Sequence, residues 1–337
     1  MSNQAAVLKE AKAQLTIEER PIPKPGADEL LVRNAAVATN PVDWKMQSTG
    51  NFIESYPTIL GSDIAGTVED VGSGATHFKK GDRVTGFARV LASKNPDHGA
   101  FQQYTVVQEC ASTKLPDSMS FEEGSILPMS IATAGTGIFL SLDIPRPPAK
   151  QQGGFLVWGA SSSVGSAVVQ IAKSLGYTVY AVCSPRHSAY AQKLGAHETF
   201  DYNDASVVNK ITQSLKASNQ HVVTAYDAIS EHGSAPMCAE ILSSSGGGKL
   251  CTTIPYPEDA TKPAGVDAVT TFAARVTSDA QDFGRWLFNE WLEKALADKT
   301  YVPSPAIEKV DGGIQAVQKA LDIHKKGLSG KKLVIPL

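Results

Sequence analysis

Residues 155–173 (FLVWGASSSVGSAVVQIAK) constrain the fold of this 337-residue chain more than any other stretch. An apolar run at 155–158 predicts a buried strand, a turn of small residues follows it, and apolar residues then recur with helical period. A further apolar run at 178–183 predicts the next strand. Together these segments predict a βαβ unit, whose turn lies where a dinucleotide pyrophosphate can bind a helix N-terminus.

The turn between strand and helix departs from the usual G-x-G-x-x-G pattern, because serines fill its middle. Gly159 allows a tight exit from the strand, and Gly165 lets the helix pack close to the sheet. The serine hydroxyls and the first backbone N–H groups of the helix are available to a phosphate. A serine-rich turn can also cap a helix without binding any ligand. The predicted binding residues are Gly159, Ser161, Ser162, Ser163, Val164 and Gly165.

The residues after the second strand bear on which dinucleotide binds. An NAD-selective fold places Asp or Glu there, about 20 residues after the glycines, to bind the ribose 2′-hydroxyl. This chain has VCSPRH at 182–187, without a carboxylate. Ser184 can donate to a 2′-phosphate and Arg186 can offer a planar guanidinium, unless the segment is merely a polar turn with a solvated arginine. Tyr202, in the next predicted loop, lines the same pocket or is a half-buried core residue. NADPH is the predicted cofactor.

Composition and charge exclude several functional classes. A formal charge of −3, 7% aromatic residues and no cluster of Lys and Arg argue against a nucleic-acid surface. Residues 1–12 lack the apolar core of a secretory signal, and no run has the length of a membrane span, so we expect a cytoplasmic protein without membrane contact. The four scattered cysteines form no C-x-x-C pair, so neither disulfides nor a thiolate metal cluster are indicated.

The chain divides into three parts by its pattern of apolar residues. Residues 1–125 are rich in strands and in Gly and Pro turns; residues 126–278 alternate strands and helices, which predicts a parallel sheet. The predicted strands are 30–38, 64–71, 83–87, 104–107, 155–158, 178–183, 222–226, 249–254, 268–276 and 331–335. The predicted helices are 164–175, 190–194, 280–297 and 312–325. We expect an α/β protein with two domains, one of them formed by residues 126–278.

The segment PTILGSDIAGTVEDVGSG at 57–74, followed by FKKGDRV at 78–84, resembles the GroES-like β-domain of the medium-chain dehydrogenase/reductase superfamily. Further matches lie at 98–104 (HGAFQQY) and 327–334 (GLSGKKLV), so the resemblance covers the whole chain and is strongest to the zinc-free, quinone oxidoreductase-like branch. It implies a GroES-like catalytic domain of residues 1–125 and 279–337. It further implies a doubly wound Rossmann domain of residues 126–278, with a cleft between the two domains.

Departures from the zinc-dependent members of this superfamily bear on the chemistry. The resemblance implies that those enzymes have a zinc-binding Cys in the segment matching 40–43 and a His-Glu pair matching Ser62 and Asp63. Asn40 and Ser62 stand here instead, and Asp63 alone cannot build a tetrahedral zinc site. The histidines show no ligand spacing, and we expect His77, His98 and His324 at the surface or in turns. We therefore expect no metal, and a substrate carbonyl polarised by hydrogen-bond donors.

The segment NPVDWK at 40–45 resembles the Asn-Pro-x-Asp-x-Lys element of fungal trans-acting enoyl reductases. The resemblance implies that Lys45 contacts the cofactor ribose or the substrate carbonyl, and that Thr133 supports the nicotinamide. The alternatives are a solvated lysine, the usual state of that residue, and a threonine bonded to its own helix. Asp43 and Trp44 are expected to shape the substrate cleft, although Trp44 can equally belong to the core. The weaker members of the predicted cleft are Asn40, Asp43, Trp44 and Tyr56.

Three hypotheses of function remain open. The first is an NADPH-dependent enoyl reductase acting on an acyl or polyketide chain, either free or bound to the carrier of a polyketide synthase partner. The second is a broad reductase of quinones, enals or aldehydes, and the third is an NADPH-binding sensor with little turnover. The predicted strand 268–276 matches an edge through which many family members pair, so the chain is expected to be a monomer or a homodimer.

Overall fold

The computed structural model describes residues 2–93 and 95–337, which form two compact units. Unit 1 comprises the chain up to Ala132 together with Ala274–Leu337, and unit 2 is Thr133–Ala273. These limits lie seven and five residues from the boundaries expected from the sequence, 125/126 and 278/279. Each unit has a sheet and an apolar core of its own.

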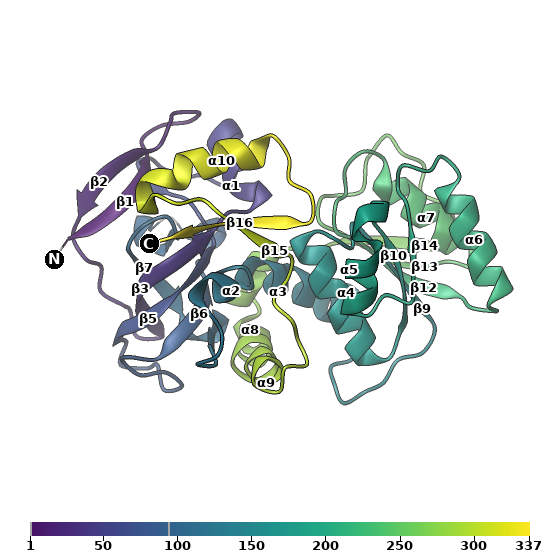
Figure 1. Cartoon of the computed structure of the whole chain (residues 1–337), viewed down its shortest axis with the longest axis horizontal. Helices are drawn as coiled ribbons and strands as arrows, with labels where there is room; N and C mark the ends of the chain where they lie inside the picture. Colours follow the sequence, from purple (N-terminus) through teal and green to yellow (C-terminus); the bar gives the residue numbers. More distant parts are fainter. Residues whose placement is uncertain (1, 94) are drawn as a thin grey trace. The chain divides into compact units, whose positions relative to one another are not determined.

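Unit 2 is built on a six-stranded sheet in which every strand pair is parallel. Its strand order is β11-β10-β9-β12-β13-β14, which is the doubly wound order of a Rossmann sheet, as expected. Figure 1 shows α4 and α5 on one side of this sheet and α6 and α7 on the other. The strands are β9 (Gly154–Trp158), β10 (Thr178–Val182), β11 (Glu198–Phe200), β12 (Val222–Asp227), β13 (Gly248–Thr252) and β14 (Val266–Thr270). The helices are α4 (Ser163–Leu175), α5 (Ser188–Leu194), α6 (Val207–Ala217) and α7 (Ser234–Ser244).

The expected strand 268–276 is wrong in its second half. The strand is β14, Val266–Thr270, and the chain then turns into the 3₁₀ helix η6, Ala273–Thr277. Thr271 donates its N–H to Thr252 but turns its hydroxyl to Thr136, at 2.7 Å, so the ladder ends there. Local β-propensity does not include contacts with distant segments, so it could not predict where this strand ends. Sequence analysis also missed α6 and α7, whose apolar faces cover the sheet.

Unit 1 contains two sheets dominated by antiparallel pairs, which agrees with the expected GroES-like β-domain. The larger, seven-stranded sheet has the order β15-β16-β3-β5-β6-β8, with β7 paired to β3. The smaller sheet has the order β2-β1-β4. The strands are β1 (Asn3–Leu8), β2 (Thr16–Arg20), β3 (Glu29–Ala38), β4 (Thr58–Ile59), β5 (Asp63–Val71), β6 (Arg83–Phe87), β7 (Tyr104–Gln108), β8 (Ser112–Lys114), β15 (Ala306–Lys309) and β16 (Lys331–Pro336).

Short helices complete unit 1, and α1 and α10 pack against each other (Figure 1). The expected helix 280–297 is present, but its middle part, Trp286–Leu292, is a π-helix; the expected helix 312–325 begins with a 3₁₀ turn, Gly313–Ala316. The helices are α1 (Pro41–Thr49), α2 (Phe121–Ser125), α3 (Pro128–Gly135, which ends in unit 2), α8 (Gln281–Arg285), α9 (Glu293–Ala297) and α10 (Val317–Lys325).

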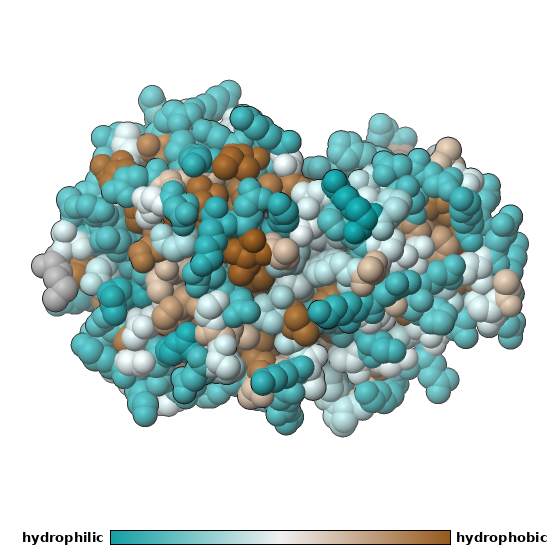
Figure 2. All heavy atoms as spheres, in the orientation of Figure 1, coloured by the Kyte–Doolittle hydropathy of each residue, from teal (hydrophilic) through white to brown (hydrophobic). Residues whose placement is uncertain are grey.

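One run within the described residues, Phe121–Ser141, is long and apolar enough to cross a membrane by composition alone. Its most apolar window is 89% buried inside the protein, so it is a core helix. On the face shown in Figure 2, hydrophilic residues predominate and the apolar ones form separate groups. The four cysteines are all buried free thiols.

Candidate active-site elements

The serine-rich turn joins β9 to α4 as a tight, helix-capping loop. Gly159 has φ = +75°, which glycine adopts without strain. A Cβ on Gly165 would lie 2.1 Å from the carbonyl oxygen of Gly159, so only glycine permits this close packing. The backbone N–H groups of Ser163 and Val164, in the first turn of α4, donate to no acceptor among the described residues. This helix N-terminus therefore has the donors that a pyrophosphate needs.

One of the three serines caps the helix. Ser162 is the N-cap of α4, and its Oγ accepts the N–H of Gly165 at 3.0 Å. Ser161 and Ser163 flank the cap and are half-buried. A structural role thus belongs to Ser162, while the binding roles predicted for the turn stay predictions.

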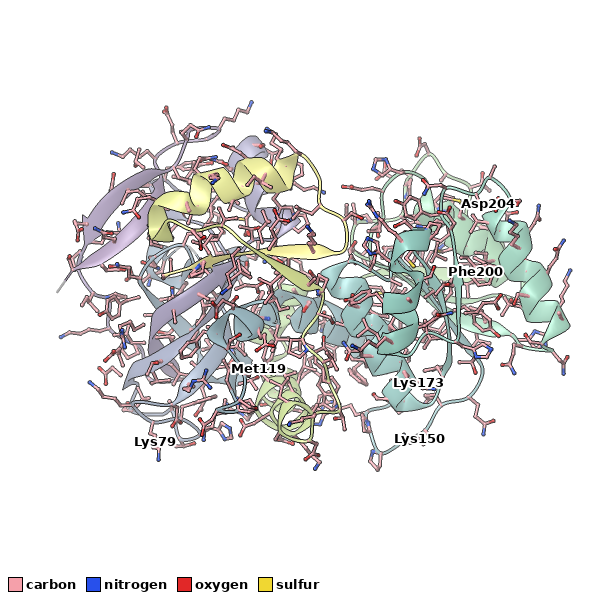
Figure 3. The ribbon with its side chains drawn as sticks, in the orientation of Figure 1. Lys79, Met119, Lys150, Lys173, Phe200 and Asp204 are labelled. Carbon is pink, nitrogen blue, oxygen red and sulfur yellow. The ribbon has the colours of Figure 1, made fainter. Side chains whose placement is uncertain are left out.

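Ser184 and Arg186 follow β10, which pairs with β9, and Tyr202 follows β11, the edge strand that pairs with β10. Ser184 is buried, Arg186 is exposed, and Tyr202 is 47% exposed, so the interpretation of Tyr202 as a core residue is wrong. Figure 3 shows Asp204, in the loop of Tyr202, at the opposite end of unit 2 from Lys173, near the C-terminus of α4. Because β9, β10 and β11 are parallel, the N-terminus of α4 and the segments after β10 and β11, which contain the predicted cofactor residues, follow the same edge of the sheet.

His187, beside Arg186, is a residue of this edge that sequence analysis did not select. Burial is the main cause that lowers its pKa, and the positive charge of Arg186 lowers it further. The imidazole is therefore neutral near pH 7, and Arg186 supplies the positive charge of this turn.

Thr133 is buried in the last turn of α3, and its carbonyl is held from the sheet side of unit 2. The Tyr226 hydroxyl donates to this carbonyl at 2.8 Å, and the Thr271 hydroxyl donates to it at 3.3 Å. Burial keeps the pKa of Tyr226 well above its usual range, so the phenol remains a donor. Directly after Thr133 and its turn, the helix widens into the π-helix Thr136–Ser141. Tyr226 lies in β12, and no sequence motif predicted its contact with Thr133.

Lys45 and Trp44 lie together in the middle of α1. The ammonium of Lys45 is 5.7 Å from the centre of the Trp44 ring, and both side chains are half-buried, so Lys45 is not a freely solvated lysine. Trp44 packs partly against the apolar core of unit 1 and also lines a shallow groove with Gln318 and Lys325. Tyr56 is likewise half-buried against this core.

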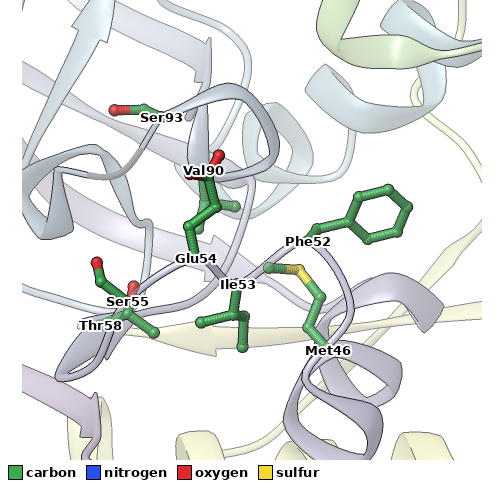
Figure 4. Close-up of a pocket in the computed structure, with 8 residues that line it drawn as sticks. All are labelled: Met46, Phe52, Ile53, Glu54, Ser55, Thr58, Val90 and Ser93. Atoms are coloured by element: carbon green, nitrogen blue, oxygen red, sulfur yellow. The ribbon is translucent and has the colours of Figure 1, made fainter.

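A second, smaller pocket lies beside α1 and the loop that follows it. Its lining combines apolar and polar side chains, and in Figure 4 Met46 and Ile53 point toward one another while the Phe52 ring points away from the others. Phe52 has φ = +63° and is 58% exposed, which is unusual for a large apolar residue. The lining residues are Met46, Phe52, Ile53, Glu54, Ser55, Thr58, Val90 and Ser93.

Asn40 and Asp43 lie at the N-terminus of α1 and are buried rather than open to solvent. The carboxylate of Asp43 accepts the N–H of Asn40 at 2.7 Å. Burial is the main cause that raises the pKa of Asp43 to about 8; the Asn40 hydrogen bond opposes this shift. Asp43 is therefore mostly protonated at pH 7, a state that its carboxylate type alone does not predict.

The side chain of Asn40 joins a buried ion pair that sequence analysis did not foresee. Lys332, from β16, is 2% exposed and places its ammonium 2.5 Å from Asp63 and 2.8 Å from the amide oxygen of Asn40. Asp63 also accepts the amide N–H₂ of Asn40 at 2.9 Å and the backbone N–H of Met129 at 2.6 Å. Lys332 is one of two adjacent lysines near the C-terminus, and only the fold separates the buried one from the exposed one.

The expectation of a surface or turn position holds for His77 and His98, whereas His324 belongs to a helix. His77 is half-buried near the surface, and His324 lies in the last turn of α10 with its ring against the Thr39 hydroxyl at 2.8 Å. His98 lies in a turn as expected but is buried, between Ser93 at 2.6 Å and Glu29 at 3.1 Å. Across residues 2–93 and 95–337, no group of three or more His, Cys, Asp and Glu side chains could hold a metal ion.

Two family models match the chain in regions that correspond to the two units. The model of the alcohol dehydrogenase GroES-like domain matches residues 26–117, and the model described as zinc-binding dehydrogenase matches residues 163–250. The second description names zinc, although the described part of the chain lacks a cluster of three such ligand side chains.

Several fungal proteins match nearly the full chain. It is 37% identical to the trans-enoyl reductase tndF of Aspergillus flavipes over 99% of both chains, and 35% identical to the dehydrogenase pigH of Monascus ruber over 100% of both. It is 42% identical to the trans-enoyl reductase tazE of Aspergillus terreus over 66% of this chain and 76% of that protein.

Solved structures share the fold at lower identity. The CurK enoyl reductase superposes with a TM-score of 0.80 at 18% identity, covering 99% of both chains. The quinone oxidoreductase of Pseudomonas syringae superposes with a TM-score of 0.75 at 24% identity, covering 100% of both. Both superpositions therefore cover nearly the whole of this chain and show that the fold is shared.

Proposed function

Because this chain belongs to the medium-chain dehydrogenase/reductase superfamily, in its quinone oxidoreductase-like and enoyl reductase group, we propose that it reduces the C=C bond of an α,β-unsaturated carbonyl compound. It is an oxidoreductase of a family that uses a nicotinamide dinucleotide. We further propose that NADPH is the reductant, that no metal takes part, and that the substrate is an enoyl thioester of the acyl or polyketide type. The observation that carries the substrate class is the similarity, at 37% identity over the full length, to a trans-enoyl reductase.

The cofactor proposal is supported by the edge of the unit 2 sheet. Gly159, Gly165 and the N–H groups at the start of α4 suit the pyrophosphate. Arg186 with the Ser184 hydroxyl suits a 2′-phosphate, because a guanidinium fork matches phosphate geometry and no carboxylate follows β10 to repel it. Tyr202 is exposed in the next loop, where it can cover the adenosine end.

The chemistry assigned to the side chains is electrostatic. When bound, NADPH supplies a hydride to the β-carbon of the substrate and leaves as NADP⁺. Lys45 stabilises the negative charge that develops on the substrate carbonyl oxygen, and Thr133 supports the nicotinamide side. A proton from water or from a side chain then reaches the α-carbon, so one hydride and one proton saturate the C=C bond.

The proposal that no metal takes part is supported by the environment of Asp63. Both of its oxygens already accept hydrogen bonds, and the ammonium of Lys332 supplies the positive charge next to it. Asn40 and Ser62, at neighbouring positions, are poor zinc ligands. We expect that dialysis against a strong chelator leaves kcat unchanged within twofold, as measured against protein supplemented with Zn²⁺. A large loss of kcat that Zn²⁺ restores would contradict the proposal that no metal takes part.

A broad reductase of quinones, enals or aldehydes is the second candidate function, and it is supported by the shared fold of the Pseudomonas syringae quinone oxidoreductase. The test is the oxidation of NADPH with a 2-enoyl thioester, a simple enal and a quinone, and with NADH in place of NADPH. Turnover confined to the thioester supports the first proposal, and comparable rates with all three support the second. Tight NADPH binding with no turnover would support the third hypothesis, a sensor.

The proposed role of Lys45 is tested in the same assay. Lys45→Ala is expected to lower kcat about 10- to 1,000-fold without changing NADPH affinity, because the lysine acts on developing charge. Lys325→Ala is a suitable control, since Lys325 is an exposed lysine that lines the groove next to Trp44. Equal losses in both variants would contradict a specific role of Lys45.

A further inference from the structure

The buried ammonium of Lys332 has no place in the proposed chemistry. A lysine at 2% exposure loses its hydration, at a cost of several kcal/mol that only paired charges and hydrogen bonds offset. The strand β16 alternates exposed Lys331 with buried Lys332, and its other buried residues are Leu333, Val334 and Ile335. An apolar side chain would satisfy the packing of this strand equally well. Core packing alone therefore does not account for the charge.

The contacts of Lys332 form a closed triangle with Asp63 and Asn40. The ammonium donates to Asp63 at 2.5 Å and to the amide oxygen of Asn40 at 2.8 Å, while the amide N–H₂ of Asn40 donates to Asp63 at 2.9 Å. Each member holds the other two, and the amide of Asn40 can satisfy both partners in one orientation only. The three residues come from β16, β5 and the residue before α1, so the triangle fixes three segments far apart in the sequence.

The triangle acts on the N-terminal turn of α1. Asn40 immediately precedes this helix, and its N–H is bonded to Asp43 inside the first turn. The helix has nine residues, too few to hold its position through its own hydrogen bonds. Lys45 lies five residues after Asn40, in the second turn. Any rotation of the first turn is therefore carried directly to Lys45.

We propose that Lys332 is a positioning residue for the reaction: its buried ammonium, paired with Asp63 and Asn40, fixes the start of α1 and so aims Lys45. This inference rests on the proposed function, in which Lys45 faces the carbonyl of the substrate. Lys332 itself touches neither substrate nor cofactor in this assignment. Its loss displaces Lys45, and a displacement of about 1 Å of a catalytic group can cost about 100-fold in rate.

The experiment compares Lys332→Met with Lys331→Met in the full chain. Lys331 is the exposed neighbour on the same strand and pairs with Glu308 at the surface, so it is a matched control. We expect Lys332→Met to lower kcat with the 2-enoyl thioester about 10- to 100-fold, with KM and the NADPH Kd changed less than threefold. Lys331→Met should retain full kcat.

A second readout does not depend on any substrate. Amide hydrogen exchange, followed by mass spectrometry, should accelerate in 41–49 in the Lys332→Met protein and stay unchanged in Lys331→Met. If the wild-type enzyme reduces none of the substrates, the proposed function is overturned. Faster exchange of 41–49 in the Lys332→Met protein would then still support the anchoring of α1 by Lys332. Unchanged exchange in this segment would overturn the positioning inference, whatever the substrate.

The single variant leaves Asp63 buried without its cation, so the protein can fail to fold for that reason alone. The double variant Asp63→Asn/Lys332→Met removes both charges and retains the volume of the core. If it is folded and its kcat remains reduced at least tenfold, the positioning role is supported. If the double variant, or the folded single variant, has kcat within threefold of wild type, the proposal is overturned.

Discussion

At the scale of single residues, the proposed preference for NADPH rests on one exposed arginine. Arg186 follows β10, has Ser184 two residues before it and has the neutral His187 beside it. Charge-assisted hydrogen bonds to phosphate contribute about 1.5–3 kcal/mol each, so one guanidinium suffices to separate the two nicotinamide cofactors.

We expect Arg186→Ala to weaken NADPH binding about 10- to 100-fold and to leave NADH binding unchanged, since only NADPH has the 2′-phosphate. Binding is measured by the quenching of protein fluorescence at fixed ionic strength. Lys193→Ala, which removes an exposed cation from the following helix, is the control and should have no effect. Equal weakening of both cofactors would contradict the role of Arg186.

The serines of the turn differ from one another in what each is expected to do. Ser162→Ala removes the N-cap of α4 and should lower the free energy of unfolding by about 1 kcal/mol. Ser161→Ala and Ser163→Ala should leave stability within about 0.5 kcal/mol of wild type, because neither side chain caps the helix. Urea denaturation without NADPH measures the capping effect on stability, and the additional stability in the presence of NADPH measures the effect on cofactor binding. An equal loss of stability in all three variants would contradict the assignment of the cap to Ser162 alone.

At the scale of elements, the helix that begins as α3 changes to a π-helix at Thr136–Ser141. The wider turn at Thr136–Ser141 coincides with the place where Tyr226 and Thr271 reach the carbonyl of Thr133. Gly137 makes this possible, because a Cβ there would lie 2.4 Å from the Tyr226 ring.

Alanine normally favours a helix over glycine by up to about 1 kcal/mol, but here we expect the opposite sign. Gly137→Ala should destabilise the protein by about 1–3 kcal/mol, since the methyl group displaces the Tyr226 ring from a filled core. The midpoint of urea unfolding measures the change. In the Tyr226→Leu background, Gly137→Ala should lower the free energy of unfolding by less than it does in the wild type, because the ring that the methyl group displaces is absent. Equal effects of Gly137→Ala in both backgrounds would refute the contact as the cause.

At the scale of the whole molecule, two groups whose pKa values are shifted mainly by desolvation couple stability to pH in opposite directions. Burial raises the pKa of Asp43 to about 8, so the folded state keeps a proton that the unfolded state loses above about 4. Its contribution to stability is thus fully present below pH 4 and is lost as the pH rises toward 8. Burial, assisted by the charge of Lys332, lowers the pKa of His324 to about 4, so its contribution is lost as the pH falls from 6.5 toward 4.

Of these two groups, the contributions oppose each other between pH 4 and 6.5, and only that of Asp43 changes between pH 6.5 and 8. We expect unfolding free energy to fall over the upper window with a slope of up to about 1.4 kcal/mol per pH unit, the value for one proton. Asp43→Asn should abolish this slope, whereas Asp117→Asn, at an exposed site, should not. Urea titrations at pH 6.5 and 8 measure it; a slope that persists in Asp43→Asn would assign the proton to another group.

The sequence by itself determined the class of fold and the position of the nucleotide turn, because these depend on local patterns. The run from Phe155 to Lys173 has its strand, turn glycines and helix period in one short window, and all three are present in the structure. The end of β14 and the exposure of Tyr202 were not predictable in this way, since both depend on how distant segments pack: the Thr271 hydroxyl bonds to Thr136, and Tyr202 remains 47% exposed.

Only the tertiary structure decided which charges are buried. Nothing local distinguishes Lys332 from Lys331, or the proton affinity of Asp43 from that of any exposed aspartate. Pairing of Lys332 with Asp63 and Asn40 requires segments separated by up to 292 positions in the chain, and the pKa of Asp43 depends on the exclusion of water by those same segments. Hydrophobic and turn patterns are encoded over a few residues, whereas desolvation and ion pairing exist only once distant parts of the chain have packed.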